Sequence, residues 1–374
     1  MNHSPRADFH VIGQPLRRKE DERLITGMGR FTDDFHIDGQ AYAVMVRSPY
    51  PHARILSIDS TAARALPGVL GVFTGAECEA ENYGAIPHDP IPKTKYDMKL
   101  AGKGGTPIFI GPHKLLPADK ARHVGEAVAM VVAETEAQAR LAAEAVQVEY
   151  DELPFVLGQP DALKADAPAV WDEIGDNVLV DTVFGDVAGT DKAFEQADHI
   201  VKMDFFIPRV TAVAMEPRAA LGSYDAKTGK YELVIGGGGC VRQRAELASV
   251  FGIDVKDLRV QTYDVGGNFG SKNRVYVEYG LVMWASKRVG RPVKFNATRS
   301  ECFLSDYQGR DLTTSVQLAL RKDGRILGLR CDNVSNVGAR CVSLSPLGKG
   351  SGLVTGSYDI PFATLRARAV FTNT

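Results

Sequence analysis

The chain has 374 residues, of which 44% are hydrophobic and 24% are charged, and its formal net charge is −2. This length and composition predict a globular protein of two or three domains. The chain has no basic stripe, which disfavours a nucleic-acid partner. It also has no apolar run of the roughly 18–20 residues that a membrane span requires, and residues 1–23 lack the apolar core of a signal peptide. We therefore expect a cytoplasmic protein without a membrane span.

The cysteines and histidines give no sign of a metal site. The five cysteines are odd in number and include no C-x-x-C pair, and the eight histidines include no H-x-x-x-H pair. These patterns argue against a disulfide framework, a zinc site or an iron–sulfur cluster held by this chain alone. Buried free thiols are the simplest interpretation, and no residue is assigned as a metal ligand.

The first 150 residues alternate short strands with helices. Residues 1–20 are polar and are expected to form an N-terminal extension. Residues 79–121 are rich in Gly, Pro, Lys and His, which favours a long excursion over the surface. A β-α-β unit is expected at residues 127–150, because Thr135 can cap its helix together with Gln138 three residues on. Further strands are predicted at residues 41–47, 55–59 and 69–73, and a short helix at residues 61–66.

The second part of the chain has clear stop signals for its helices. One helix is predicted at residues 241–251 and ends at Gly252. Another is predicted at residues 276–289, where Gly290 and then Pro292 end it. Hairpin signals accompany several of the strands, which are predicted at residues 198–206, 219–224, 230–235, 258–263, 292–297, 313–320 and 326–334. The pattern predicts an α+β fold in two domains without an internal repeat.

The most informative stretch is residues 264–272, Asp-Val-Gly-Gly-Asn-Phe-Gly-Ser-Lys, between a predicted strand and a predicted helix. Glycines allow positive φ and let main-chain N–H groups converge on an anion, and a following helix adds its positive N-terminal end. The spacing matches neither a P-loop nor a dinucleotide fingerprint. A second glycine run, residues 236–239, also follows a strand. The two loops could frame one polyanionic ligand, or glycine could simply relieve tight turns.

Several segments together resemble one family. The chain is similar to the N-terminal half of the molybdenum-binding large subunit of the xanthine dehydrogenase/aldehyde oxidase/carbon monoxide dehydrogenase family. Within these segments, the charged residues Glu216 and Arg218 are expected to serve internal hydrogen bonds. The segments that carry the resemblance are residues 23–34, 47–53, 124–129, 215–219, 265–272 and 355–358.

The resemblance implies a fold and a cofactor. Residues 21–152 would form an α/β hammerhead domain, and residues 153–374 would form the first molybdopterin-binding domain. The implied cofactor is molybdenum–molybdopterin in its cytosine dinucleotide form, with Fe–S clusters and FAD on partner subunits. The implied cofactor-binding residues belong to the two glycine loops and are Gly266, Gly267, Asn268, Phe269, Gly270 and Ser271, together with Gly237, Gly238 and Gly239.

Three residues depart from the family pattern. Gly238 stands where the family usually has a glutamine near the metal, so backbone amides or water would replace that contact, or it would be lost. Asn268 stands where the family more often has glycine. Asn273 stands where purine-oxidising members have a substrate-binding glutamate. We therefore take Asn273 as a substrate-contact candidate and disfavour a purine substrate. A solvent-facing asparagine at a helix start is the alternative.

The resemblance also implies that catalysis needs residues beyond this sequence. The general base, a glutamate in a Gly-x-Gly-Glu motif, and the second molybdopterin-binding domain would come after residue 374, so no residue here is assigned a catalytic role. The implied function is oxidation of an aldehyde or N-heterocycle with water as oxygen donor. The expected partners are a chain that carries the second molybdopterin-binding half, an FAD-binding medium subunit and a [2Fe-2S] small subunit.

Other functions remain open at this point. A non-catalytic structural or assembly subunit would explain the missing base and the departure at Gly238. A truncated fragment would also lack the base, and in either case we expect the isolated chain to be inactive. A stand-alone nucleotide-binding enzyme fits worst, because neither phosphate-binding motif matches.

Overall fold

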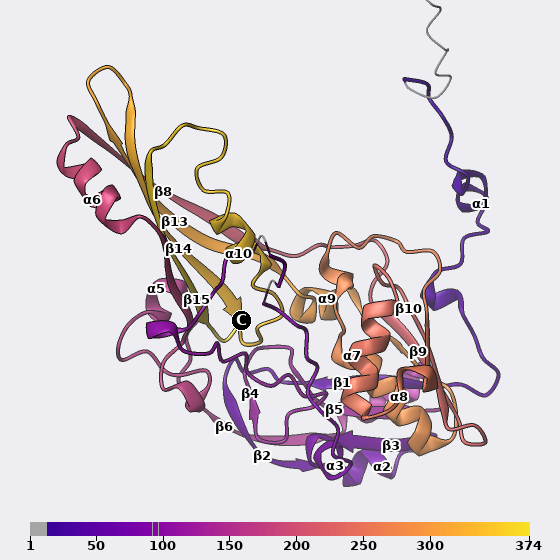
Figure 1. Cartoon of the computed structure of the whole chain (residues 1–374). Helices are drawn as coiled ribbons and strands as arrows, with labels where there is room; N and C mark the ends of the chain where they lie inside the picture. The colour runs from indigo at the N-terminus through magenta and orange to yellow at the C-terminus, as the bar shows by residue number, and fades with distance from the viewer. Residues whose placement is uncertain (1–12, 92, 96) are drawn as a thin grey trace, which may run out of the picture.

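The computed structural model describes residues 13–91, 93–95 and 97–374, and its strands form sheets that are crossed or flanked by helices (Figure 1). The predicted α+β class is confirmed. Most of the predicted extension, residues 1–12, lies outside the described residues. Within the described ranges, no helix is both long enough and apolar enough to cross a bilayer.

A seven-stranded sheet takes strands from both sides of residue 152. Its order is β11-β10-β9-β12-β1-β5-β3. The two parts of the sequence join where β1 pairs in parallel with β12, with Ala41 opposite Val293. One sheet and one hydrophobic core therefore cross the expected domain boundary. The strands are β1 (Ala41–Arg47), β3 (Val69–Thr74), β5 (Ala127–Ala133), β9 (Ala219–Asp225), β10 (Lys230–Ile235), β11 (Leu258–Gln261) and β12 (Val293–Asn296).

Two predicted helices pack on this sheet and carry the site loops. The helix α7 (Val241–Phe251) ends at Gly252, and α8 (Val277–Val289) ends at Gly290, both with positive φ as the stop signals predict. The middle of α8 is buried. Its Trp284 packs edge-on against Phe73 of β3, with 5.0 Å between ring centroids, so the helix connects the two parts of the sequence.

The predicted strand–helix–strand order at residues 127–150 is confirmed, but the two strands do not share a sheet. The helix α4 (Glu136–Glu144) begins with the predicted capping box, in which the N–H of Gln138 donates to Thr135 Oγ1 over 3.2 Å. All residues of β5 are buried, whereas β6 (Gln147–Glu152) is mostly exposed. A polar strand of that kind suits a solvated sheet, and β6 pairs with β2 (Ala53–Asp59), which also pairs with β4 (Lys120–Ala121).

A five-stranded sheet projects away from the seven-stranded sheet (Figure 1). Its core lies around Trp171 and Phe371, and α6 (Val187–Glu195) packs on β14 and β15. The sequence signals did not predict β7, α6 or β15. In sheet order the strands are β7 (Val178–Gly185), β15 (Phe362–Phe371), β14 (Ile326–Gly338), β13 (Gly309–Leu320) and β8 (His199–Val210).

The prediction that residues 79–121 run over the surface is wrong in part. Ile86, Leu115 and Leu116 of this segment are buried in the main core. The Gly- and Pro-rich composition correctly indicated irregular backbone but did not show which apolar residues anchor it. The five cysteines are free, as expected. The remaining helices are α1 (Asp21–Ile25), α2 (Thr61–Arg64), α3 (Gly75–Ala80), α5 (Gln159–Ala162), α9 (Arg299–Ser305) and α10 (Ser345–Ser351).

The close approach of α8 to β9 gives a test of this packing. A Cβ on Gly222 would lie 2.9 Å from the backbone nitrogen of Met283. We expect Gly222→Ala to lower the free energy of unfolding by about 1–3 kcal/mol, because backbone atoms cannot move away cheaply. Gly350→Ala is the matched control, since nothing lies within 4 Å of a Cβ there. Equal urea midpoints for the two variants would contradict the packing described here.

Candidate functional site

The glycine–phenylalanine loop joins β11 to α8 and is held in unusual backbone conformations. Gly267 has φ +111° and Gly270 has φ +93°, and Phe269 between them has φ +47°, which few residues other than glycine adopt. The Phe269 side chain is 79% exposed. Within the described part of the chain, the N–H groups of residues 267–270 donate to no acceptor. The loop therefore offers a set of free donors beside an exposed ring.

The second glycine loop, residues 236–239, lies directly against the first. The N–H of Gly238 donates to the carbonyl of Lys272 over 3.1 Å. The N–H of Gly237 donates to Thr262 Oγ1 at 3.4 Å, just before the first loop begins. The structure thus brings together the two loops that the sequence singled out. The second loop leads into α7, and Arg242 in the first turn of that helix lines the same cavity as Phe269.

A buried ion pair fixes the base of the first loop. The Glu216 carboxylate accepts hydrogen bonds from the N–H of Gly266 at 2.9 Å, from the N–H of Thr32 at 3.3 Å and from Lys272 Nζ at 3.1 Å. The Lys272 side chain is 1% exposed and also donates to the Glu216 carbonyl at 2.8 Å. The expected internal role of Glu216 is confirmed. Sequence reasoning did not find its partners, because they lie 50 or more residues away.

Two asparagine amides occupy the space beside Gly238. Asn268 Oδ1 accepts the N–H of Lys272 at 3.1 Å, and Asn268 Nδ2 donates to Asn273 Oδ1 at 2.8 Å. A Cβ on Gly238 would lie 1.9 Å from Asn273 Oδ1 and 2.3 Å from Asn268 Nδ2. Any side chain at residue 238 would therefore displace this pair. The departures at residues 238, 268 and 273 are parts of one local arrangement.

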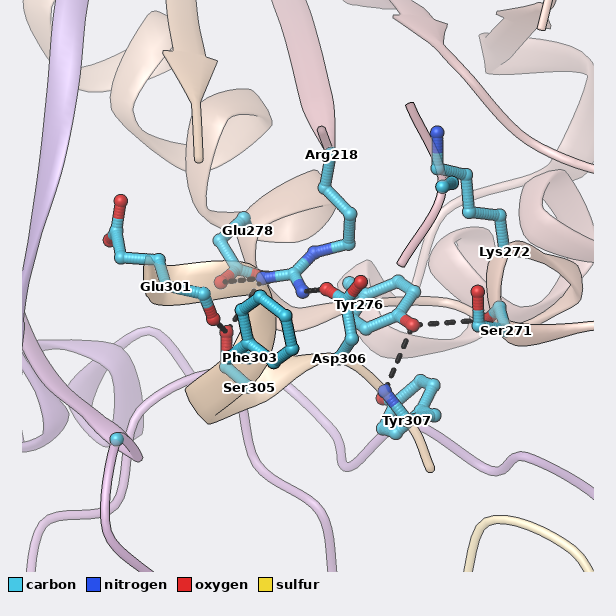
Figure 2. A network of polar contacts seen from close by, with 12 residues as sticks. Arg218, Ser271, Lys272, Tyr276, Glu278, Glu301, Phe303, Ser305, Asp306 and Tyr307 are labelled. Atoms are coloured by element: carbon cyan, nitrogen blue, oxygen red, sulfur yellow. Dashed lines mark hydrogen bonds and ion pairs between the residues drawn. The ribbon is translucent and has the colours of Figure 1, made fainter. Parts of the chain in front are cut away.

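A buried charge network supports the loop from behind (Figure 2). Arg218 is fully buried and donates to Glu278 and Ser305, each at 2.9 Å, and to Asp306. Arg47 also donates to Glu278, at 2.9 Å. Burial alone would raise the pKa of Glu278, but Arg218 and Arg47 hold this pKa at about 2. Burial raises the pKa of Asp306, where Arg218 opposes the rise and the like charge of Glu278 adds to it.

Tyr276 connects this network to the loop (Figure 2). Its hydroxyl donates to the Ser271 carbonyl at 3.0 Å and accepts the N–H of Tyr307 at 3.1 Å. The rings of Tyr276 and Tyr307 stack with 4.2 Å between centroids, and the Arg218 guanidinium lies 4.2 Å from the Tyr276 ring centroid. Burial raises the pKa of the Tyr276 hydroxyl, so it stays protonated and can donate at neutral pH.

The loop faces a cavity of about 1320 Å³. Phe269, Asn273 and Arg274 line one side of it, and the strand ends at residues 209–212 and 335–337 line another. The carboxylates in its wall are paired with arginines, as in the ion pair between Glu126 and Arg340. Among the described residues, no group of three or more His, Cys, Asp or Glu side chains is placed to hold a metal ion.

Two family models match the chain. Residues 26–154 match a model described as the a/b hammerhead domain of aldehyde oxidase and xanthine dehydrogenase. Residues 170–374 match a model described as a molybdopterin cofactor-binding domain. The glycine loops, Glu216 and the Asn268–Asn273 pair all lie within the second match.

Individual relatives show the same likeness. The nicotine 6-hydroxylase large subunit of Paenarthrobacter nicotinovorans is 33% identical over 99% of this chain, which spans 44% of that protein. The crystal structure of quinoline 2-oxidoreductase from Pseudomonas putida 86 superposes with a TM-score of 0.85 at 33% identity, over 96% of this chain and 44% of that one. The nicotinate dehydrogenase large molybdopterin subunit of Eubacterium barkeri is 28% identical over 98% of this chain, which spans 80% of that subunit. The chain thus spans less than half the length of several relatives.

The depressed pKa of Glu278 predicts a defined pH dependence. A carboxylate whose pKa falls on folding stabilises the protein above its unfolded pKa, and this contribution disappears as the pH falls through the folded pKa. We expect Glu278→Gln to lower the free energy of unfolding by about 3–5 kcal/mol at pH 7, because it removes the buried carboxylate that Arg218 and Arg47 share. The difference from wild type should shrink as the pH falls from about 4.5 to about 2.

Urea denaturation across this pH range measures the effect. Glu173→Gln, at an exposed position, is the control and should follow the wild-type curve. A difference between Glu278→Gln and wild type that stays constant down to pH 2 would contradict the assigned ion pairs.

The contact of Gly238 with the asparagine pair predicts that substitutions at residues 238 and 273 are energetically coupled. In a double-mutant cycle of Gly238→Ala and Asn273→Ala, we expect a coupling energy of about 0.5–1.5 kcal/mol, since the two positions compete for one space. Gly309→Ala replaces Gly238→Ala in the control cycle, because a Cβ at Gly309 meets nothing within 4 Å. Additive free energies of unfolding in both cycles would refute the arrangement.

Proposed function

Because this chain belongs to the family of molybdenum-binding large subunits of xanthine dehydrogenases, aldehyde oxidases and carbon monoxide dehydrogenases, we propose that it forms one wall of the molybdenum cofactor site of a hydroxylase. That enzyme oxidises an aldehyde or an N-heterocycle with water as oxygen donor. The observation that carries the proposal is the row of free N–H groups at residues 267–270, of which Phe269 and Gly270 line the cavity.

The described residues fit a polyanionic cofactor. A Cβ at Gly239 or Gly270 would meet nothing within 4 Å, so the backbone is open to a ligand there. Free main-chain donors and a helix N-terminus both favour phosphate oxygens. We assign the phosphate-bearing part of a molybdopterin cytosine dinucleotide to residues 237–239 and 266–271. The cofactor supplies the redox chemistry when bound, and this chain holds and orients it.

We propose that Asn273 contacts the substrate. Its Oδ1 is engaged by Asn268, so the amide offers its Nδ2 donor to the cavity. A donor at this place suits an acceptor atom such as an aldehyde oxygen or a ring nitrogen. The exposed ring of Phe269 adds an apolar wall for a flat substrate. The names of the nicotine and quinoline relatives support a nitrogen heterocycle.

In this proposal the general base comes from outside the described cavity wall. The cavity carboxylates Glu126, Glu278 and Asp306 are each paired with an arginine, so none of them is a free general base. We place the base on a chain that carries the second molybdopterin-binding half. The nicotinate dehydrogenase large molybdopterin subunit, of which this chain spans 80%, supports a division of this kind. An FAD-binding medium subunit and a [2Fe-2S] small subunit complete the proposed complex, and the free cysteines favour the cytoplasm.

Metal and nucleotide analysis tests this function. The complex is purified from the source organism through a tag on this chain and assayed for molybdenum and for cytidine nucleotide released by acid hydrolysis. We expect one of each per copy of the chain. A complex without molybdenum would refute the proposal.

A variant of the loop separates a catalytic role from an assembly role. Phe269→Ala is expected to lower turnover about 10–100-fold, because it removes the wall that positions the reacting groups. Phe362→Ala, at an exposed ring on β15 outside the cavity, is the matched control. Unchanged turnover in Phe269→Ala, with molybdenum still bound, would favour a non-catalytic structural or assembly subunit.

A further inference from the structure

Positive charge is concentrated in the wall of the cavity. Among the described residues that line it, eight are lysine or arginine and three are Asp or Glu. The three carboxylates, Glu126, Glu278 and Asp306, are each paired with an arginine. The wall therefore carries an excess of positive charge, and a cleft lined by one sign of charge raises the local concentration of ligands of the opposite sign.

Arg274, in this wall, forms no ion pair within the described parts of the chain. Its Nη1 donates to the His88 carbonyl at 2.5 Å and its Nη2 donates to Ser343 Oγ at 3.2 Å, and both acceptors are neutral. The side chain is half-buried. Burial and the neighbouring charge of Arg242 lower the pKa of Arg274. A half-buried guanidinium with only neutral partners is stabilised by an anion that reaches it.

Arg242 places a second guanidinium at the same point. It lies in the first turn of α7, lines the cavity and also donates to the His88 carbonyl. We call Arg242 and Arg274 the arginine pair. The carboxylate bonded to the pair is that of Glu246, which lies 2.7 Å from Arg242 Nε. Two guanidiniums that share one carbonyl oxygen repel each other, and Glu246 offsets only one of the two charges.

The shared carbonyl belongs to a residue that the fold holds in place. The His88 ring is 2% exposed, its Nε2 lies 2.8 Å from His113 Nδ1, and it packs edge-on against Tyr307. Burial, with the charges of the arginine pair, lowers the pKa of His88 to about 3, so the ring is neutral at pH 7. The arginine pair is therefore anchored to a buried residue and is not a pair of freely moving surface side chains.

We propose that the arginine pair binds the carboxylate of an anionic substrate. This inference rests on the proposed function and narrows its substrate class to aldehydes or N-heterocycles that carry a carboxylate group. The planar guanidinium suits this role, because its N–H groups match the two oxygens of a carboxylate. Donors remain for such a ligand, since Arg274 Nε and Arg242 Nη1 have no acceptor among the residues that the structure describes.

The contacts of the pair favour a substrate carboxylate over a cofactor phosphate. Arg274 directly follows Asn273, the proposed substrate contact, and both residues line the cavity. The guanidinium of Arg274 is bonded to His88 and Ser343, and neither of these belongs to a glycine loop. The free N–H groups of residues 267–270 already provide donors for the cofactor phosphates. An anion at the arginine pair therefore lies beside the substrate contact and outside the residues assigned to the cofactor.

Binding of benzoate and benzamide tests the arginine pair. The two probes have nearly the same shape and differ in charge. The complex is purified from the source organism through a tag on this chain, and titration calorimetry gives both Kd values. We expect benzoate to bind about tenfold more tightly than benzamide, since charge-assisted hydrogen bonds are about twice as strong as neutral ones. This preference should disappear in Arg274→Gln.

Two further variants complete the experiment. Arg242→Gln should also weaken the preference, and its side chain is 41% exposed, so this substitution disturbs the fold least. Arg310→Gln is the matched control, because Arg310 lines the same cavity and its substitution removes the same charge. We expect Arg310→Gln to keep the preference for benzoate. Thermal unfolding of each variant shows whether it is folded, and each complex is assayed for molybdenum and cytidine nucleotide.

Four results contradict the proposal, and they are distinct. If wild type binds both probes equally, or if both arginine-pair variants keep the preference, the carboxylate site is refuted, and the proposed function stands as long as molybdenum is present. If Arg310→Gln also abolishes the preference, the effect belongs to the general charge of the cavity. If the arginine-pair variants lose molybdenum and cytidine nucleotide, the pair holds a cofactor phosphate. If the wild-type complex contains no molybdenum, the proposed function fails, and the substrate assignment fails with it.

Discussion

The Glu216 carboxylate is the contact on which the geometry of the site depends. It is nearly buried and accepts hydrogen bonds from Thr32 and from Gly266 and Lys272 of the first glycine loop, so that with Glu216 itself it joins three separate parts of the sequence. A buried charge is stable only when it is paired and fully hydrogen-bonded. The three segments must therefore adopt one arrangement. Since the carbonyl of Lys272 also accepts the N–H of Gly238, the second glycine loop is fixed by the same contact.

The backbone groups on the inner side of the loop have hydrogen-bond partners, whereas the N–H groups on its outer side have none among the described residues. Gly266, Ser271 and Lys272 use their N–H groups within the protein, and Tyr276 holds the Ser271 carbonyl from behind. The N–H groups of residues 267–270 have no such partners in the described chain. Donors that are already aimed at a ligand need little reorganisation when it binds. The two networks around Glu216 and Arg218 thus hold the loop in the arrangement that the proposed anion site requires.

Local signals in the sequence predicted most of the elements around the site. Gly252 and Gly290 marked the ends of α7 and α8, and Thr135 marked the start of α4, because caps and stops depend on a few adjacent residues. The pairing of β1 with β12 could not be predicted in this way, since it joins residues some 250 positions apart. The strands β7 and β15 were missed for a related reason. β7 is an edge strand and β15 an interior strand of the five-stranded sheet, and no local pattern reveals the order of strands in that sheet.

The sequence singled out the two loops of the candidate site but not the contacts between them. The glycine pattern drew attention to residues 236–239 and 264–272, and the structure places these two loops against each other. At Gly238 the sequence showed a missing side chain and left its replacement open. The structure places the Asn268 and Asn273 amides in that space. Sequence alone cannot show this, because the three positions become neighbours only when β10, α7 and the loop before α8 are assembled.

The two larger hydrophobic cores differ in how they close. The core around α8 and Trp284 includes Tyr276, whose hydroxyl holds the Ser271 carbonyl of the first glycine loop. The core around Trp171 and Phe371 thins toward β8, whose side chains are nearly all exposed. The first loop is therefore anchored to the core that closes around α8. It follows that the arrangement of the two glycine loops depends on contacts within this chain, since the second loop is bonded to the first through Gly238 and Lys272.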